Sequence, residues 1–310
     1  MKVLVAGAGG AVGARLIPKL IEAGHDVVAL TRSEGKASAL RDHGAEPVAT
    51  DLLDRAAVLE AVSRATPEVI IHQATSLAGV KSLRNFDREF ALTNRLRTEG
   101  TDHLLEAARA VGARRLIAQS YGNWNYERTG DRLKSEDDPF DPSPPKKQVE
   151  SLAAIRHLEK AVLEDSGLEG VVLRYGNFYG PGTDFSEDGE IVRQLRRRQL
   201  PIVGTGAGVW AFVHIEDAAS AAVAAIDGPP GTYNIVDDQP RPVAEWLPEL
   251  ARITGSKPPF RVPVWLGGLL AGEVVVSMMT QMRGTSNAKA KRELGWQPRY
   301  PRFPDGLSDA

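Results

Sequence analysis

Apolar residues occur in short continuous runs that alternate with stretches of helical spacing over the first 176 residues. The run KVLVAG (2–7) is typical of a buried parallel strand, and VGARLIPKLIEAG (12–24) has the spacing of a helix that ends at a glycine. Further strands are predicted at 26–31, 45–50, 67–74, 114–120 and 170–176, and further helices at 34–43, 54–65, 86–111 and 148–165. This alternation predicts an α/β fold, a doubly wound parallel sheet with helices on both faces.

The pattern changes in two later regions. Residues 123–150 are polar and rich in proline, which favours a long loop, and loops of that length are usually functional or disordered. Beyond residue 176 the alternation loosens. We therefore expect a main domain of residues 1–176 and 205–231, and a smaller lobe of residues 177–204 and 232–310. The run VPVWLGGLLAGEVVVSMM is interrupted by glycines and Glu273, so we interpret it as a helix of that lobe and not as a membrane span.

Composition excludes several classes of site. Of 310 residues, 42% are apolar and 25% are charged, as in ordinary soluble domains. No cysteine is present, so disulfides, thiol nucleophiles and Cys-ligated zinc are excluded, and we expect no metal. The net charge of −2 gives no reason to expect nucleic acid or a membrane as partner. No signal-peptide pattern follows Met1, so we expect a cytoplasmic protein with a small-molecule substrate, and we leave a homodimer open.

A glycine-rich turn follows the first predicted strand. Glycine allows a tight turn and close backbone approach to a pyrophosphate, and the N-terminus of the next helix offers N–H donors and a positive dipole. Because this turn lies between a strand and a helix at the start of an alternating chain, it predicts a dinucleotide-binding Rossmann domain. The predicted phosphate-binding residues are Gly7, Gly10, Ala11, Val12 and Gly13.

The ends of the next strands add candidate cofactor contacts. The second strand ends in Thr31-Arg32, without the carboxylate that accepts the ribose hydroxyl of NAD, so Arg32 is expected to pair with the 2′-phosphate of NADP. NAD is the alternative cofactor. Asp51 is placed to accept from the adenine amino group, with Leu52 beside it. The fourth strand ends in His72 followed by Gln73, Ala74 and Thr75; these last three are expected under the middle of the cofactor, and His72 is expected to be structural.

Five motifs together resemble the extended branch of the short-chain dehydrogenase/reductase superfamily, which is rich in nucleotide-sugar epimerases and dehydratases. They are the Gly7/Gly10/Gly13 spacing, ATDLLD (49–54), LRYGNFYGPG (173–182), VHIEDAA (213–219) and SNAKAKRELGWQP (286–298). The resemblance covers nearly the whole chain. It implies a Rossmann main domain, a C-terminal substrate lobe, an active site between them, and a cofactor contact at Tyr175.

The chain departs from this family at the catalytic positions. Family members typically use a Ser at the end of the fifth strand and Tyr-x-x-x-Lys on the following helix, where Tyr and Lys lie one turn apart and face the cofactor together. Ser120 matches the serine, but the Tyr and Lys positions fall on Ser151 and Ile155. A family asparagine on the preceding helix is replaced by Arg97, with Asn94 one turn earlier as a substitute.

Other residues are candidates for the missing chemistry. Tyr121 and Tyr126 could bring a phenol near Ser120, and with it they are our predicted catalytic residues. Lys147 could supply the missing cation if the helix begins that early. The position of the family arginine that holds a nucleotide-sugar diphosphate is occupied by Trp210, which cannot bind a phosphate as a guanidinium does. We therefore expect an apolar or aromatic substrate, with Asn94, Phe178 and Trp210 as contacts.

These observations predict an NADP(H)-dependent oxidoreductase that acts on a small apolar or aromatic carbonyl or alcohol. Two alternatives stay open. The chain could catalyse a non-redox or oxygen-dependent reaction (isomerase, lyase, oxygenase) on the same fold, or it could be a regulatory protein that senses dinucleotides without turnover.

Overall fold

A seven-stranded parallel sheet forms the centre of the computed structural model, which describes residues 1–77, 80 and 82–307. Its strand order is β12-β7-β5-β4-β1-β2-β3. The strands are β1 (Lys2–Ala6), β2 (Asp26–Thr31), β3 (Glu46–Ala49), β4 (Val69–His72), β5 (Arg115–Tyr121), β7 (Glu169–Tyr175) and β12 (Gly231–Ile235). Every adjacent pair is parallel, which confirms the predicted doubly wound sheet.

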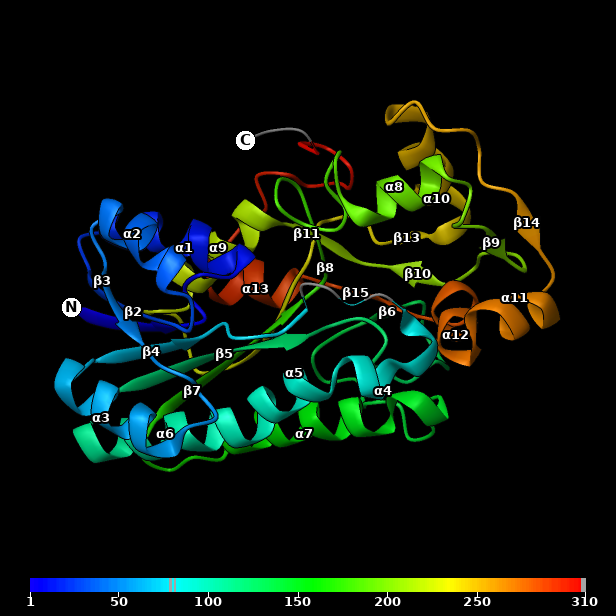
Figure 1. Cartoon of the computed structure of the whole chain (residues 1–310). Coiled ribbons are helices and arrows are strands. Elements are labelled where there is room, and N and C mark those ends of the chain that lie inside the picture. Colours follow the sequence, from blue (N-terminus) through cyan, green and yellow to red (C-terminus); the bar gives the residue numbers. More distant parts are fainter. Residues whose placement is uncertain (78–79, 81, 308–310) are drawn as a thin grey trace.

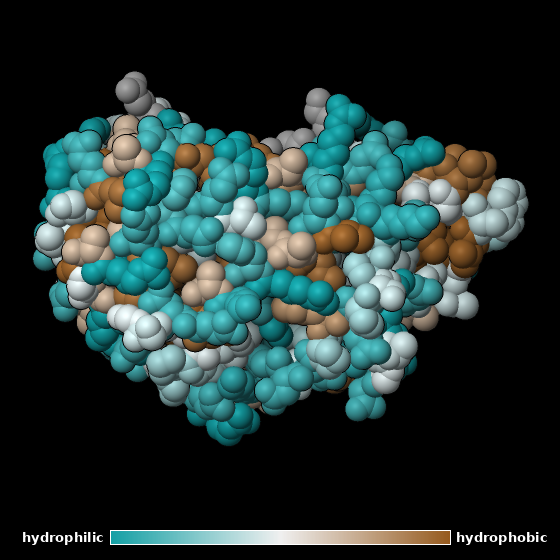
Figure 2. Space-filling model, turned by 90° about the horizontal axis from the view of Figure 1, so that it is seen from below, coloured by the Kyte–Doolittle hydropathy of each residue, from teal (hydrophilic) through white to brown (hydrophobic). Residues whose placement is uncertain are grey.

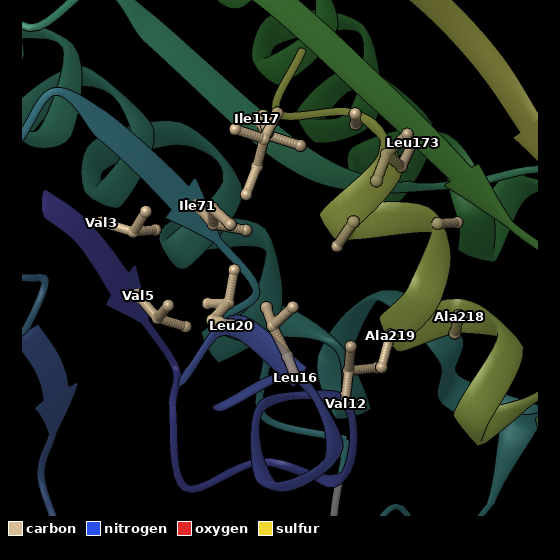
Figure 3. Packing of buried hydrophobic residues seen from close by; sticks show 14 of the residues in the cluster. Val3, Val5, Val12, Leu16, Leu20, Ile71, Ile117, Leu173, Ala218 and Ala219 are labelled. Carbon is tan, nitrogen blue, oxygen red and sulfur yellow. The ribbon is translucent and has the colours of Figure 1, made fainter. Parts of the chain in front are cut away.

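Helices cover both faces of this sheet (Figure 1). One face carries α1 (Ala11–Glu22), α2 (Glu34–Asp42) and α9 (Ile215–Ala224), and the other carries α3 (Arg55–Ala65), α6 (Thr101–Val111) and α7 (Val149–Leu163). Figure 3 shows how Leu16 and Leu20 of α1 and Ala219 of α9 pack with the sheet residues Val5 and Ile71. The small alanines of α9 allow this helix to approach α1 closely, so the two helices form one layer.

The predicted helix at 86–111 is confirmed as helical apart from a turn at Phe90, but it is not a uniform α-helix. The segments are α4 (Phe86–Glu89), α5 (Ala91–Arg95), a π-helical turn η2 (Leu96–Gly100), and α6. The π turn leaves the Leu96 carbonyl to accept a hydrogen bond from His72 Nε2 at 3.2 Å, which ties the helix to the end of β4. Single π turns inside helices occur frequently at functional sites.

The C-terminal third is built from short strand pairs and helices. The strands are β8 (Asn177–Tyr179), β9 (Ile202–Val203), β10 (Val209–Trp210), β11 (Phe212–His214), β13 (Arg241–Pro242), β14 (Arg261–Val262) and β15 (Gly284–Thr285), and β15 pairs with β6 (Leu133–Lys134) of the proline-rich stretch. The helices are α8 (Glu190–Arg196), α10 (Val243–Ile253), α11 (Val264–Ala271), α12 (Glu273–Thr280) and α13 (Ala288–Glu293). The boundaries of the two predicted domains stay a prediction.

The apolar run at 262–279 forms two helices, which corrects the expectation of one. Gly272 separates α11 from α12 with φ of +90°, a conformation that favours glycine and ends the first helix. Trp265 of α11 is 71% exposed. Seen from the side of α3, α6 and α7, the surface is largely hydrophilic, and apolar side chains gather at the end of the molecule where α11 lies (Figure 2). Within the described residues, none of the helices combines the length and apolar character needed to cross a bilayer.

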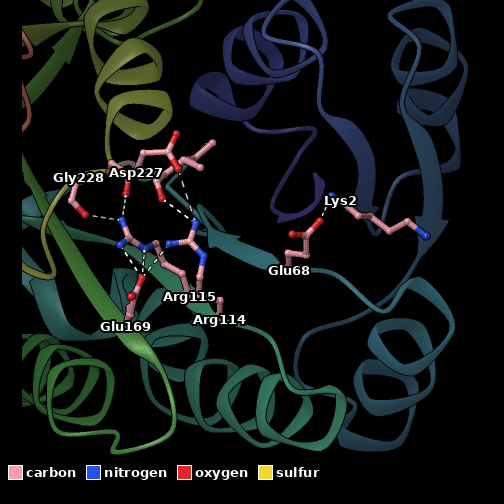
Figure 4. Close-up of polar contacts among 9 residues, drawn as sticks. Lys2, Glu68, Arg114, Arg115, Glu169, Asp227 and Gly228 are labelled. Carbon is pink, nitrogen blue, oxygen red and sulfur yellow. Dashed lines mark hydrogen bonds and ion pairs between the residues drawn. The ribbon is translucent and has the colours of Figure 1, made fainter.

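The edge of the sheet where the strands begin is held by paired charges (Figure 4). Buried Arg115 pairs with Glu169 at 2.6 Å and donates to the carbonyls of Ala225 and Gly228. The backbone N–H of Lys2 donates to Glu68. Because these polar groups satisfy one another, this edge has a structural role, and the candidate site lies at the opposite edge, where the strands end.

Candidate functional site

The turn between β1 and α1 brings backbone close to the end of β4. Gly7 has φ of +88°, and a Cβ placed on it would lie 2.6 Å from the backbone of Ala74. A Cβ on Gly13 would lie 2.4 Å from the Ala8 carbonyl oxygen, so α1 can pack against the turn only with glycine there. The N-cap, Gly10, makes no side-chain capping bond, and no acidic residue occupies the first turn of α1. Helix N–H donors and dipole are therefore available to an anion.

The predicted residues Ala11 and Val12 form the first turn of α1, and the end of β2 lies beside them. Thr31 accepts from the N–H of Ser33 through its hydroxyl at 3.2 Å, and Arg32 is exposed. Lys36 of α2 reaches across and donates through Nζ to the Gly9 carbonyl. Two cations, Arg32 and Lys36, therefore flank the glycine-rich turn. The sequence analysis missed Lys36, although its position one turn into the helix after Arg32 was a usable signal.

Residues after β3 and β4 border the same turn. Asp51 is exposed and accepts from the N–H of Leu53, while the side chain of Leu52 is buried. Gln73 is buried and donates to the Tyr175 hydroxyl at 3.4 Å, but its side-chain oxygen has no partner among the described residues. Ala74 and Thr75 are partly buried, and the Ala74 N–H donates to His72 Nδ1. Burial lowers the pKa of His72 to about 4, so the imidazole is neutral and structural.

Ser120 lies in a buried polar network behind the end of β5. Its hydroxyl donates to Glu159 at 2.6 Å, and Glu159 receives two hydrogen bonds from Arg174. Arg174 also donates to the Tyr126 hydroxyl, which itself donates to Asn234 at 2.7 Å. Burial disfavours the charge of Arg174, but the bonds to Glu159 outweigh it and raise its pKa. The hydroxyls of Ser120 and Tyr126 therefore already donate hydrogen bonds to other residues of the protein.

The first turn of α7 is also fully bonded. Ser151 is 0% exposed; its hydroxyl donates to Asp87 at 2.6 Å and accepts from Asn94 Nδ2 at 3.0 Å. Asp87 also accepts the backbone N–H groups of Glu150 and Ser151, so it caps α7 from α4. Ile155, one turn later, is buried among apolar residues. Lys147 precedes α7, and its ammonium donates to Asn85, away from Ile155's turn of the helix.

Tyr121 belongs to an aromatic cluster that we define as Phe86, Phe90, Tyr121 and Trp124. Phe86 stacks on Phe90 with ring centroids 4.0 Å apart, and Trp124 lies 5.2 Å from Phe86 and 5.9 Å from Tyr121. The Tyr121 hydroxyl donates to Asn177 at 2.8 Å. Burial raises the pKa of Tyr121, so the phenol stays protonated near neutral pH. The sequence analysis missed Phe86, Phe90 and Trp124, because nothing in their spacing shows that they meet.

The aromatic cluster continues into the C-terminal part of the chain. It packs with Leu152 and Ile155 of α7 and with Val274 and Met278 of α12. Trp210 touches this group and donates through its indole N–H to the Met278 carbonyl at 2.9 Å. Trp210 also packs on Phe185 and Trp246 in a separate core, so it joins the two.

Tyr175 and Phe178 lie on the other side of the sheet end. Tyr175 is fully buried and donates to the Ala218 carbonyl at 3.2 Å. The Phe178 ring is partly buried, 5.3 Å from that of Tyr175. The structure therefore places Phe178 beside Tyr175 and the first core, and it groups Asn94 and Trp210 with the aromatic cluster.

Arg97 lies on the π turn η2, above the ends of β4 and β5. It is only 5% exposed, and its Nε and Nη1 atoms have no hydrogen-bond partner among the described residues. Burial lowers its pKa to about 10, with Tyr121 and Glu159 opposing the shift, so the guanidinium stays charged. The side-chain oxygen of nearby Asn94 is buried and unpartnered as well.

A separate groove lies on the outer surface between α6 and α7, with a volume of about 640 Å³. Charged side chains line it, including Asp102, Arg109 and His157, and His157 bonds Asp102 at 2.8 Å. None of the predicted site residues lines this groove. It is therefore distinct from the site at the strand ends, and His157 is a surface residue.

Comparison with known proteins assigns the fold to a family. Residues 3–235 match the model of the NAD dependent epimerase/dehydratase family. The chain belongs to this family. A Streptomyces protein described as 3-diazoavenalumate denitrifying reductase is 44% identical over 310 residues, which is 99% of each chain. These matches confirm the resemblance to short-chain dehydrogenases/reductases and an NAD(P)-dependent enzyme family.

Solved structures of two UDP-glucose 4-epimerases resemble the chain. The Thermus thermophilus enzyme in complex with NAD is 25% identical, with a TM-score of 0.73, over 99% of this chain and 96% of that one. The Thermotoga maritima enzyme with UDP-glucose is 24% identical with a TM-score of 0.78, over the same shares of the two chains, and shows the fold alone. Together with the family match, the NAD complex supports a nicotinamide dinucleotide cofactor for this chain.

The glycine-rich turn fits that cofactor, because Gly7 and Gly13 allow the turn to pack against the Ala74 backbone and the Ala8 carbonyl, and the N-terminus of α1 carries no side-chain cap. At the catalytic end, this family member has no tyrosine followed four residues later by lysine anywhere in its sequence. The positions predicted for that pair, Ser151 and Ile155, are buried and satisfied by the fold. Among the candidate site residues that the structure describes, the side-chain oxygens of Gln73 and Asn94 and the Nε and Nη1 atoms of Arg97 have no hydrogen-bond partner.

Proposed function

We propose that this protein is an NADPH-dependent reductase that replaces the diazo group of a small aromatic substrate with hydrogen. The observation that carries the proposal is the extent of the match to the diazoavenalumate reductase, 44% identity over 99% of both chains. The name of that relative describes reduction of a diazo compound with loss of nitrogen. The proposal keeps the predicted class of oxidoreductase and changes the group that is reduced.

The chemistry explains why a tyrosine–lysine pair is dispensable. Hydride transfer to a carbonyl creates an alkoxide, which needs a proton donor, and losing such a donor typically costs ~10²–10⁴ in rate. Hydride transfer to a diazonium cation needs no added proton. The hydride brings two electrons and one hydrogen, a C–H bond replaces the C–N bond, and N₂ leaves. The cation becomes neutral, so atoms and charge balance without an acid at the position of Ser151.

The cofactor would be held at the glycine-rich turn, and it would supply the hydride. The N-terminus of α1 and the close approach of Gly7 to Ala74 favour the pyrophosphate there. The lack of a carboxylate after β2 and the two cations Arg32 and Lys36 favour the 2′-phosphate of NADPH over NADH. Asp51, Leu52 and Thr75 are proposed as further contacts, as the sequence predicts.

The substrate is proposed to contact the aromatic cluster. Rings of Tyr121 and Trp124 offer planar apolar surface to another aromatic ring. Among the three predicted catalytic residues, we now favour Tyr121 as the residue that touches substrate, because its ring belongs to the aromatic cluster. The hydroxyls of all three donate within the fold, that of Tyr121 to Asn177, so the proposed contact of Tyr121 is made by its ring. Trp210 in place of an arginine disfavours a nucleotide-sugar diphosphate.

The test is a turnover assay with 4-carboxybenzenediazonium and NADPH. We expect NADPH oxidation, release of N₂ and formation of benzoate in equal amounts, at a rate well above that of NADPH alone. The Gly13→Val variant serves as a control, because we expect it to bind the cofactor more weakly. Equal rates with and without protein would reject the proposal. Faster reduction of aromatic ketones or aldehydes than of the diazonium would restore the carbonyl prediction, and Tyr121→Phe should then lower turnover by ~10²-fold or more.

A further inference from the structure

Arg97 differs from the other buried arginines of the described residues. Arg115, 3% exposed, pairs with Glu169 and two backbone carbonyls, and Arg174, 6% exposed, pairs with Glu159 and Tyr126. Arg97 is buried to the same degree, but its Nε and Nη1 atoms have no hydrogen-bond partner among the described residues. A buried charge without a partner costs several kcal/mol, so folded proteins seldom keep one unless a ligand completes it.

The neighbours of Arg97 do not neutralise it. Glu159 is the carboxylate that raises the pKa of Arg97, but both oxygens of Glu159 already bond Arg174, and one also receives Ser120. Tyr121 stays protonated because burial raises its pKa. The third neighbour, His72, is neutral at physiological pH.

The surroundings are suited to an anionic ligand. Ile155 and the aromatic cluster exclude water on the α7 side, which strengthens an ion pair through the low local dielectric. The side-chain oxygens of Gln73 and Asn94, which have no partner among the described residues, are hydrogen-bond acceptors and do not bond an anion. Buried Arg97 of η2 is therefore the group that offers N–H donors to an anionic oxygen.

We propose that Arg97 binds an anionic oxygen, carboxylate or phenolate, of the aromatic substrate. This inference rests on the proposed function and names the second charge of its substrate. A diazonium compound that also carries an anionic oxygen is a zwitterion, and its negative end neutralises the buried guanidinium. The protein thus recognises the anionic group of the molecule and not only its aromatic ring.

Ligand binding without turnover tests this inference separately from the reductase activity. The protein is saturated with NADP⁺, and tryptophan fluorescence or calorimetry gives dissociation constants for two matched pairs of probes. One pair is cinnamate and cinnamamide, and the other is 4-nitrophenolate and 4-nitroanisole. We expect one anion to bind at least about tenfold more tightly than its neutral partner, which is about 1.4 kcal/mol. The pair that shows the preference identifies the carboxylate or the phenolate as the group bound.

The variants are Arg97→Met, Arg97→Lys and the control Arg95→Met. Arg95 lies two residues away, is exposed, and pairs with Glu99. Arg97→Met should lose the preference for the anion and Arg97→Lys should keep part of it, while the control behaves like wild type. No preference in wild type, or a preference that survives in Arg97→Met, would overturn the inference. A preference lost in Arg97→Met supports it even if no diazo compound is reduced.

Thermal stability supplies an independent readout. Because Arg97 Nε and Nη1 have no partner among the described residues, Arg97→Met should melt at the same temperature as wild type or higher. Arg115→Met, which breaks a paired buried charge, should melt well below wild type. A fall in Arg97→Met as large as that in Arg115→Met would show that the protein itself neutralises Arg97, and it would also overturn the inference.

Discussion

Two ends of the site differ in how they offer polar groups to a ligand. At the glycine-rich turn, recognition depends on backbone: Gly7 and Gly13 make room, and the start of α1 presents N–H groups. Near α7, recognition depends on side chains, because Arg97, Asn94 and Gln73 keep unpartnered atoms while Ser151 is fully bonded. The glycine spacing of the family is present at the turn, and its tyrosine–lysine pair is absent from the sequence.

Under the proposed function, this chain would bind its cofactor at the glycine-rich turn and would need no tyrosine–lysine pair for proton transfer. Few residues can replace glycine at these two positions of the turn, because any side chain there would clash with backbone atoms. A proton donor can be lost when the substrate does not require one. The Ser151 hydroxyl donates to Asp87, so this position of α7 offers no charge. The positive charge near α7 belongs instead to Arg97 of η2.

The largest effect is expected from breaking the first end with Gly13→Val. The new side chain meets the Ala8 and Gly7 carbonyl oxygens at 2.4 and 2.6 Å, so α1 must move away from the turn. Overpacking of this kind costs about 1–3 kcal/mol, and we expect NADPH to bind up to about 100-fold more weakly. The measurement is the NADPH dissociation constant from fluorescence.

Gly35→Ala is the matched control for that change, because its Cβ would have its nearest neighbour, Ser33 Oγ, at 3.8 Å. NADPH affinity should be unchanged in this variant. Wild-type affinity in Gly13→Val would show that the turn does not hold the cofactor.

Removing the two cations beside the turn should have the next largest effect. Arg32→Ala and Lys36→Ala should each weaken NADPH by about 10-fold or more and leave NADH unchanged, since charged hydrogen bonds contribute about 1.5–3 kcal/mol. Arg41→Ala, an exposed arginine at the other end of α2, is the control. If wild type binds NADH as tightly as NADPH, the assignment of NADPH is wrong.

At the second end, His72 predicts a dependence of stability on pH. Burial lowers its folded pKa to about 4, against about 6.5 when unfolded, so the unfolded chain binds more protons between these values. The stability contributed by neutral His72 is present above pH 6.5 and is lost as the pH falls toward 4. When the pH falls from 7 to 5, the decrease in the free energy of unfolding should be about 2 kcal/mol smaller for His72→Asn than for wild type.

Urea unfolding of both proteins at the two pH values measures this difference. Comparing the change with pH, and not the stability itself, removes any fixed cost of the substitution. Equal changes in wild type and His72→Asn would mean that the histidine is not held neutral beneath Arg97.

The smallest effect on turnover is expected from Ser151→Ala. Its hydroxyl bonds Asp87 and Asn94 inside the fold, so kcat should stay within a small factor of wild type. The unfolding free energy should fall by about 1 kcal/mol, the typical contribution of a buried hydrogen bond. A loss of kcat without a loss of stability would return a catalytic role to this helix and contradict the comparison.

The sequence by itself determined the sheet, its helices and the dinucleotide turn. Short apolar runs such as 2–7 and helical spacing such as 12–24 are local signals, and burial of both faces of each strand leaves few other arrangements. The glycine positions of the turn could also be predicted from the sequence, because two backbone segments that approach closely leave no room for a side chain. The departure at Ser151 and Ile155 was visible from spacing alone.

Only the tertiary structure decided which polar groups remain free. Ser120 and Tyr126 were candidates from the sequence, but they are bonded to Glu159 and Asn234, whereas Arg97 keeps Nε and Nη1 without a partner among the described residues. Phe86 and Trp124 are 38 positions apart and meet only when α4 packs against the end of β5. Whether a polar atom is satisfied depends on contacts between distant segments, and no local pattern encodes that.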